Sequence, residues 1–215
     1  MYTPKQFEAP DQAALYALME RFSFAPLITT GPDGPLVTHL PFLIERGEDG
    51  EGRLIGHMAR ANGQWRGFTG QAEALVIFQG PHAYISPSWY GEPLSVPTWN
   101  YTVAHAYGRP RLIEDEGRVY AILRALVDQH EAPRAAPWTM DALPASYIQG
   151  MMRGIVAFEL EIERLEGKFK LNQNRPLADQ QRVIAALSAS DDPLEQDVAA
   201  AMAEALVPHA GALGD

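Results

Sequence analysis

The sequence contains no cysteine, and this absence excludes several kinds of site at once. A chain without thiols has no disulfide framework, no thiolate metal site and no cysteine nucleophile. No apolar run approaches the ~18 residues that a membrane-spanning helix needs. The start of the chain, MYTPKQFEAPD, lacks the basic and apolar regions of a secretory signal. We therefore expect a cytoplasmic protein that does not associate with membranes.

Basic residues are scarce. The 215 residues include 17 Lys and Arg against 27 Asp and Glu, which gives a net charge of −10. Proteins that bind nucleic acid gain affinity by neutralising phosphates and normally carry a basic face. Residues 176–215 hold only one basic residue, Arg182, and seven acidic ones. This charge distribution disfavours DNA binding, above all by the C-terminal segment.

Several motifs with known chemistry are also missing. The sequence has no G-x-G-x-x-G after a strand, no G-x-x-x-x-G-K-[ST], no H-E-x-x-H and no G-x-S-x-G. Its 47% hydrophobic and 20% charged residues are ordinary for a globular protein. The length suits one large domain, or one domain with an appendage.

Helical spacing and turn residues divide the chain into expected elements. Asp11 and Asp192 are expected helix caps, and Pro176 is expected to open a helix. The expected helices cover residues 11–22, 61–69, 114–131 and 140–150, with two more starting at 176 and 192. The expected strands cover residues 25–29, 36–44, 53–58, 74–79, 100–113, 154–165 and 168–173, with a turn at 46–52.

This order of elements indicates a mainly β, α+β fold. Strands fill the middle of the chain and are joined mostly by short turns, without a regular βαβ alternation. We expect an antiparallel barrel with helices packed around it. The barrel domain is expected to span residues 1–175, and residues 176–215 to form a helical extension.

The segment GHMARANGQW, residues 56–65, is a candidate phosphate site. Arg60 and Asn62 lie where a strand is expected to meet a helix, and unpaired backbone N–H groups at such a junction attract anions. A guanidinium and a carboxamide strengthen this attraction. The alternative is that Arg60 pairs with a carboxylate and Asn62 caps the helix.

A proline inside an expected strand marks a second candidate, Thr38–Pro41. Proline cannot donate to a β-ladder, so it favours an edge strand or a place where the partner strand is missing. A ligand or a second subunit could occupy that place. The alternative is a simple corner of the barrel.

Aromatic residues are concentrated near an expected loop, residues 86–99. Trp89, Tyr90, Trp99 and Tyr101 could form the walls around a flat ring system. They could equally form a satellite core or a dimer interface. Three histidines that could converge on a metal, His57, His82 and His105, more often make backbone hydrogen bonds at strand ends, so we predict no metal site.

The segment KFKLNQNR, residues 168–175, places three amides between basic residues in an acidic chain. Asn172, Gln173 and Asn174 could read the polar edge of a ring. The alternative is a solvated strand end.

These segments together resemble one family. MYTPKQF, THLPF, GHMARANGQW, VIFQGPHAYISPSWY, VPTWNY and KLNQNR are similar to sequences of the PaiB family, from Met1 to about Ala205. Members of that family are described as FMN-binding negative transcriptional regulators. The resemblance implies a split β-barrel, a homodimer and an FMN cofactor between the subunits.

The resemblance also implies which residues bind FMN. Ala59, Arg60 and Asn62 would bind the phosphate, and Thr38, His39 and Leu40 would meet the edge of the isoalloxazine ring. Gln79 and Trp99 would lie beside the ring, and the segment 172–175 would reach over it. The complete expected set is Thr38, His39, Leu40, His57, Ala59, Arg60, Asn62, Gln79, Trp99, Asn172, Gln173, Asn174 and Arg175.

Two other functions remain open at this stage. A flavin-dependent oxidoreductase of small molecules would need an acid or base near the flavin, and His39 or His57 is the best candidate. We predict no catalytic residue. A haem-handling protein could use His57 or His105 as an iron ligand.

Overall fold

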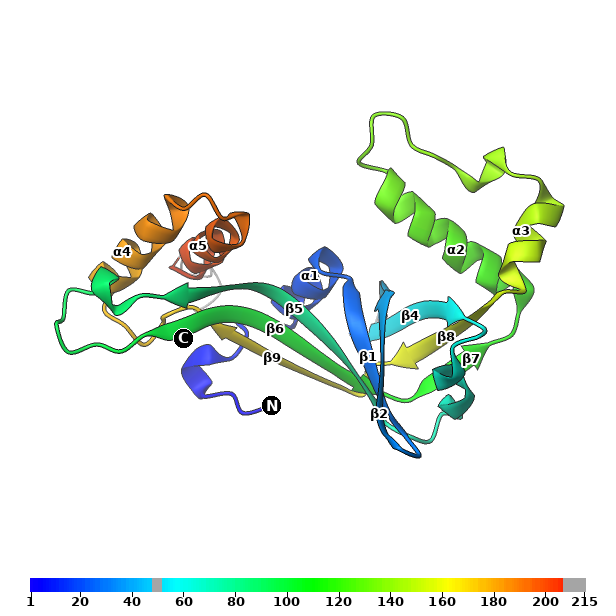
Figure 1. Ribbon diagram of the computed structural model, residues 1–215, viewed down its shortest axis with the longest axis horizontal. Helices are drawn as coiled ribbons and strands as arrows, with labels where there is room; N and C mark the ends of the chain where they lie inside the picture. Colours follow the sequence, from blue (N-terminus) through cyan, green and yellow to red (C-terminus); the bar gives the residue numbers. More distant parts are fainter. Residues whose placement is uncertain (48–51, 207–215) are drawn as a thin grey trace, which may run out of the picture. The chain divides into compact units, whose positions relative to one another are not determined.

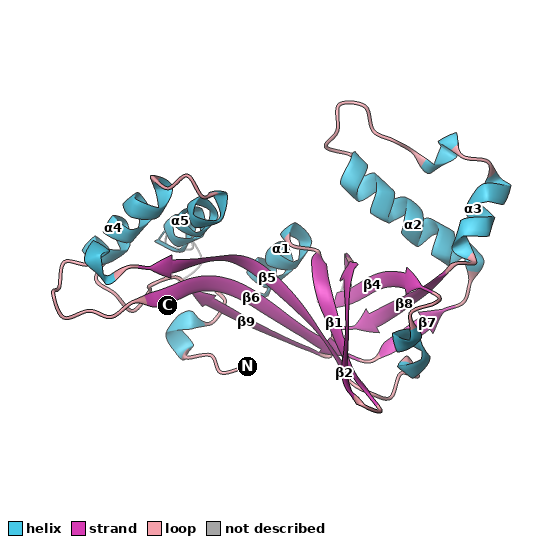
Figure 2. Cartoon of the chain, viewed as in Figure 1, coloured by secondary structure: helices cyan, strands magenta, loops and turns pink. Residues whose placement is uncertain are grey.

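The protein is an α+β molecule built from two antiparallel sheets and helices, as its computed structural model shows (Figures 1 and 2). The structure describes residues 1–47 and 52–206. The mainly β architecture with peripheral helices that the sequence predicts is confirmed. Within the described residues the two sheets are not joined into a closed barrel. Most of the turn expected at 46–52 lies outside these residues.

The α-helices begin close to the expected capping residues. Asp11 accepts a hydrogen bond from the backbone N–H of Ala14 at 2.8 Å, and Asp192 accepts one from Leu194 at 2.9 Å. Both caps are therefore confirmed. The helices are α1 (Gln12–Arg21), α2 (Glu116–Glu131), α3 (Ala145–Met152), α4 (Leu177–Ser188) and α5 (Pro193–Leu206). No helix in the described part of the chain is long and apolar enough to cross a membrane.

Short 3-10 helices stand where two longer helices were expected. The segment 61–69 contains only η2 (Gly63–Gly67), and the segment 140–150 is divided into η4 (Met140–Ala142) and α3. Pro144 interrupts the second segment, since proline has no N–H to continue a helix. The remaining short helices are η1 (Lys5–Phe7) and η3 (Pro87–Trp89).

The strands form one sheet in the order β2-β1-β5-β6-β9 and another in the order β3-β4-β8-β7. β2 is therefore an edge strand, as the proline at position 41 suggests. The strands are β1 (Phe24–Gly31), β2 (Gly34–Pro41), β3 (Leu43–Arg46), β4 (Gly52–Ala59), β5 (Ala74–Ile85), β6 (Thr98–Gly108), β7 (Pro110–Ile113), β8 (Ile155–Glu161) and β9 (Arg164–Lys170).

Three segments expected as single strands are each divided between the two sheets. The segment 36–44 breaks at Phe42, whose fully buried ring packs edge-on against Phe158 at 6.2 Å. The segment 154–165 breaks after β8, where Ile162 donates its N–H to Gly52 and Glu163 donates to Tyr107. The third break, in 100–113, follows Gly108. A pattern of alternating residues does not reveal a change of sheet, so these single-strand predictions were wrong.

β5 is longer than expected, because it continues through Gly80 and Pro81 to Ile85. Its neighbour β1 pairs with it only at Leu75 and Val76, well before the proline. The missing N–H of Pro81 therefore removes no hydrogen bond to β1, and the proline is tolerated within the strand. β5 therefore reaches the start of the expected loop 86–99, and this loop is shortened only at its other end, where β6 begins at Thr98.

The chain divides into two compact units. The first comprises Met1–Leu18, Gln79–Ala104 and Gly167 onward, and the second comprises Met19–Phe78 and His105–Glu166. In the first unit a buried cluster includes Ile85, Leu187 and Met202. In the second unit α2 packs on β8 and β7 through a cluster that includes Ile113, Val119 and Ala157.

We predict that Gly108→Ala destabilises the protein by about 1–3 kcal/mol, the usual cost of an overpacked site. A methyl group at residue 108 would collide with the backbone oxygen of Glu161 and the side chain of Leu160. Urea unfolding of the purified variant measures the change. Gly67→Ala is the matched control, because a Cβ at residue 67 meets nothing within 4 Å. Equal stability of the two variants would contradict this account.

Candidate functional site

In the first unit, an aromatic hollow of about 340 Å³ lies on the outward face of β5 and β6. Residues that alternate along a strand share one face, and this places Trp99, Tyr101 and Val103 together. Thr102 of β6 and Gln79 and His82 of β5 complete the lining. The structure thus brings Gln79 and Trp99, both predicted to lie beside a flavin ring, to the same hollow.

The ring of Trp99 is the main surface of this aromatic hollow. Its side chain is 53% exposed, although tryptophan is usually well covered. The ring of His82 lies 6.4 Å from it at an angle of 35°, and the ring of Tyr84 meets it edge-on at 6.0 Å. The amide of Gln79 lies 3.3 Å from Nδ1 of His82. A flat ligand could stack on Trp99 while Gln79 offers a polar group to its edge.

Two lysines of β9 add positive charge beside the aromatic hollow. Lys170 donates through Nζ to the hydroxyl of Thr98 and, at 2.5 Å, to the backbone oxygen of Trp99. The ammonium group of Lys168 lies 5.4 Å from the ring centre of Tyr101. Burial lowers the pKa of Lys170, and the charge of Lys168 lowers it further. The hollow therefore suits a flat ligand that carries negative charge.

Within the predicted segment 172–175, Asn172 and Arg175 contact Tyr90, which directly follows η3. Asn172 is buried with a φ of 66°, and its amide donates to the hydroxyl of Tyr90 at 3.2 Å. Gln173 accepts from the N–H of Leu171 at 2.7 Å. Arg175 lies 4.3 Å above the ring of Tyr90. Of the four predicted residues, Asn174 alone is classed as exposed.

In the second unit, Thr38 and Asn62 are brought together, as predicted. The amide of Asn62 donates to the hydroxyl of Thr38 at 2.9 Å, and Asn62 also caps η2 by accepting from the N–H of Gln64. The hydroxyl of Thr38 in turn donates to the side-chain oxygen of Gln64. The capping role that was the alternative for Asn62 is therefore present.

Gln64 is the central residue of this cluster, and sequence reasoning missed it. Its side chain is 4% exposed, and its amide nitrogen lies within 3.2 Å of Leu27 O, Thr29 Oγ1 and Leu36 O. It links η2 to both β1 and β2. A glutamine two positions after the capping Asn62 is the only local signal that could have identified it.

His39 and Leu40 of β2 point to opposite faces of the edge strand. The ring of His39 is exposed and stacks on Phe24 at a centroid distance of 6.2 Å. Leu40 is buried and pairs with Ala25. Of these two residues, only His39 thus offers a polar side chain.

Arg60 fastens the ends of β4 and β8 to each other. Its Nε donates to the backbone oxygen of Arg153 at 2.9 Å, and a terminal nitrogen donates to that of Ile155 at 2.7 Å. The neighbouring Ala59 is exposed and pairs with Ile155. The alternative in which Arg60 pairs with a carboxylate is not what the structure shows, because the partners of its guanidinium are two backbone carbonyls. Arg60 and Arg153 both line a cavity of about 450 Å³.

His57 lies on β4 opposite Ala157. Its Nδ1 is buried and has no hydrogen-bond partner among the described residues. Burial lowers the pKa of this imidazole below its usual value of 6.5. The neutral form is therefore favoured in the folded protein.

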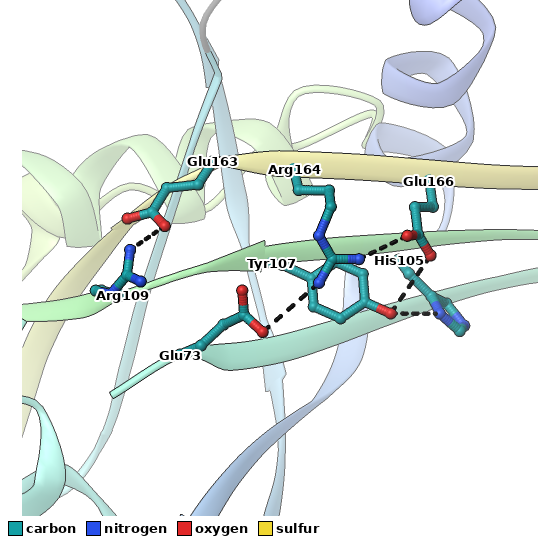
Figure 3. A network of polar contacts seen from close by, with 7 residues as sticks. All are labelled: Glu73, His105, Tyr107, Arg109, Glu163, Arg164 and Glu166. Carbon is teal, nitrogen blue, oxygen red and sulfur yellow. Dashed lines mark hydrogen bonds and ion pairs between the residues drawn. The ribbon is translucent and has the colours of Figure 1, made fainter. Parts of the chain in front are cut away.

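His105 belongs to a polar network on β6 and β9 (Figure 3). The hydroxyl of Tyr107 lies 3.5 Å from Nδ1 of His105 and 3.5 Å from a carboxylate oxygen of Glu166. The guanidinium of Arg164 lies 3.4 Å above the ring of Tyr107 and also pairs with Glu73 at 3.6 Å. The imidazole of His105 thus has a polar partner within the chain, and its position is explained without a bound ligand. No group of His, Asp or Glu suited to a metal ion occurs among the residues described.

Comparison with known proteins places the chain in a family. The sequence model of the family described as "Putative FMN-binding domain" matches residues 1–164. The chain belongs to this family. It is also 34% identical to the protease synthase and sporulation protein PAI 2 of Bacillus subtilis, over 96% of this chain and 98% of that protein. The predicted membership of the PaiB family is thereby confirmed, and FMN is the cofactor for which the matched family is named.

Solved structures share the fold of this PaiB-family chain. The flavocytochrome Anf3 of Azotobacter vinelandii matches with a TM-score of 0.56 at 17% identity, over 76% of this chain and 69% of that one. The FAD and heme binding protein of Mycobacterium smegmatis matches with a TM-score of 0.53 at 16% identity, over 83% and 79%. At such identities the likeness establishes the fold.

We predict that the free energy of unfolding falls as the pH drops below about 6.5, with a contribution from His57. Because burial lowers the pKa of His57 in the folded state, the unfolded chain binds this proton more readily and is favoured in acid. Urea unfolding at about pH 8 and about pH 5.5 gives the loss of stability, which should be smaller in His57→Gln. The same loss in both proteins would contradict a buried neutral His57.

Proposed function

We propose that the protein binds FMN and acts as a regulator of the PaiB type. The observation that carries the proposal is the aromatic hollow, in which an exposed Trp99 lies with Gln79, while Lys170 contacts the backbone of Trp99 and Lys168 the ring of Tyr101. FMN combines a flat ring with a phosphate, and these residues match both properties. Membership of a family named for FMN binding supports the same ligand.

The roles of this chain's own residues follow from their positions. Trp99 would stack on the ring, Gln79 would donate to its polar edge, and Lys168 and Lys170 would offset its negative charge. In the second unit, Arg60 remains a separate candidate contact for a phosphate, with Asn62 and Thr38 shaping the turn beside it. Bound FMN would supply a ring that accepts and returns electrons.

A homodimer in the cytoplasm is the form in which we propose that the protein acts. The aromatic hollow is open on its outward face, and Tyr84 beside it is 44% exposed. A second copy of the chain would cover these rings and remove them from water. Sedimentation analysis with and without FMN tests this part of the proposal.

The regulatory part rests on family membership. The name of the Bacillus subtilis relative refers to protease synthesis and sporulation. The seven acidic residues of the segment 176–215 oppose direct contact with DNA, so we propose that regulation acts through a protein partner. A salt-sensitive, sequence-specific mobility shift with the purified protein would overturn this indirect route.

A flavin-dependent oxidoreductase is the second candidate function. His82 favours it, because its titratable ring lies beside Gln79 and Trp99 where a bound flavin would be. The matched solved structures include a flavocytochrome. Steady oxidation of NAD(P)H by the FMN-loaded protein would support this function, and its loss in His82→Gln would assign the proton transfer.

The direct test of FMN binding is the absorption spectrum of the purified protein, followed by titration with FMN. Saturable quenching of flavin fluorescence is expected. A colourless protein that leaves the fluorescence unchanged would contradict the proposal.

We predict that Trp99→Ala weakens FMN binding by about 1–3 kcal/mol, the usual contribution of stacking between an aromatic side chain and a base. The same fluorescence titration measures the dissociation constant. Trp138→Ala is the matched control, because Trp138 is 43% exposed and lies in the second unit. Equal affinities of the two variants would exclude the aromatic hollow as the ring site.

We predict that Arg60→Ala weakens FMN binding by about 1.5–3 kcal/mol, as expected for a charge-assisted phosphate contact. Riboflavin, which lacks the phosphate, should bind wild type and variant alike. Arg134→Ala is a surface control, since Arg134 is exposed and pairs only with Glu131 in the described structure. Unchanged FMN affinity in Arg60→Ala would remove Arg60 from the site.

A further inference from the structure

The second unit contains a cavity of about 450 Å³ at one edge of the four-stranded sheet. β8 pairs with β4, where Ala59 is opposite Ile155, and with β7, where Ile113 is opposite Ala157. β4 and β7 run in the same direction, so both end at the edge where β8 begins. Figure 1 shows α2 and α3 beside this edge. We name this space the edge cavity.

The floor of the edge cavity is apolar and buried. It is formed by Ile113 and Ala157 of the sheet and by Val119 of α2, which belong to one hydrophobic cluster. Met152 of α3 and Trp65 of η2 form its walls. Such a floor favours a ligand with an apolar body.

Two arginines border the edge cavity, Arg60 directly after β4 and Arg153 shortly before β8. Arg60 is fixed by its bonds to the carbonyls of Arg153 and Ile155. The side chain of Arg153 is exposed, and no described residue makes a hydrogen bond or ion pair with it. A guanidinium without an internal partner is available to a carboxylate.

Two carboxylates border the edge cavity on the side of β7. Glu114 and Glu116 are exposed, and neither makes a hydrogen bond or ion pair within the described chain. Their neighbours are engaged, since Asp115 caps α2 and Arg118 pairs with Glu159. The cavity therefore keeps positive charge on one side and negative charge on the other.

The spacing of the strands sets the distance between the two charged sides. Arg60 follows β4 and Glu114 follows β7, and one strand, β8, separates them. Two strand spacings amount to about 10 Å. Arg153 lies shortly before β8, which is next to β7, so a ligand that reaches from Arg153 to Glu114 has to place its two charges up to about 10 Å apart.

We propose that the edge cavity binds a small amphipathic zwitterion, with its carboxylate at Arg153 and its ammonium group at Glu114 and Glu116. The apolar body between the two charges would lie on Ile113, Val119 and Ala157. A second cavity, of about 490 Å³, shares Glu116, Gln149 and Met152 with the first. The ammonium end thus has room for larger substituents.

The proposed zwitterion contacts differ from the proposed FMN contacts, because Arg60, which borders the edge cavity, belongs only to the FMN proposal. The three charged residues that define the zwitterion site, Arg153, Glu114 and Glu116, have no role in the FMN proposal. FMN carries no cationic group for the glutamates. Competition between the two ligands therefore tests whether the sites are distinct.

Isothermal titration of the full-length protein with ω-aminooctanoic acid tests the proposal, because this probe places a carboxylate and an ammonium group about 10 Å apart on an apolar chain. Octanoate and octylamine are the matched probes that each lack one charge. We expect each to bind roughly tenfold more weakly or worse, since each loses a charge-assisted contact. Equal binding of either probe, or no binding of ω-aminooctanoic acid at millimolar concentration, would overturn the proposal.

Variants assign the two charged sides. Arg153→Gln should weaken binding of ω-aminooctanoic acid roughly tenfold without changing that of octylamine, and Glu114→Gln with Glu116→Gln should do the same without changing that of octanoate. Arg134→Gln and Glu204→Gln are exposed controls that should bind like wild type. The probe series on the wild-type protein decides the question even where a variant is unstable.

Titration with FMN present separates this proposal from the FMN proposal. We expect ω-aminooctanoic acid to bind equally well to the free and the FMN-saturated protein. Displacement of one by the other would overturn a separate site and assign the edge cavity to the phosphate of FMN. A protein that ignores FMN but binds the probe would reject the FMN proposal alone.

Discussion

The antiparallel pairing of β8 with β4 on one side and β7 on the other is the constraint on which the second unit depends. It brings Arg60, Arg153 and Glu114 to one edge of the sheet, although they are far apart in sequence. α2 and α3 then pack on the same strands. The charges at this edge are therefore a product of strand order, since each of these residues stands close to an end of β4, β7 or β8.

The first unit obtains its candidate site by a different route. Its ligand surface is one face of two neighbouring strands, where outward residues alternate with buried ones along β5 and β6. The lining of the hollow on this face includes the ring-bearing side chains of His82, Trp99 and Tyr101, which suits a planar ring. The lysines of β9 contribute charge without filling it, because Lys170 is held by the backbone of Trp99.

Local signals in the sequence were sufficient for the helix caps and insufficient for the places where the chain passes from one sheet to the other. The caps at Asp11 and Asp192 depend on residues two or three positions away, and both were predicted. The change of sheet at Phe42 depends on contact with Phe158, which no local pattern contains. The same holds for the site. Aromatic clustering pointed to Trp99, but Arg153 carries no local signal, because only the pairing of β8 places it beside Arg60.

The buried cluster of the first unit has a consequence for how this protein could be shortened. Leu187 and Met202, from the two C-terminal helices, pack against Ile85 of β5, although the family model ends at residue 164. Helices α4 and α5 thus contribute to the interior of this unit. Expression of the family-matched region alone would leave the back of β5 in water, so a soluble minimal fragment has to keep both helices.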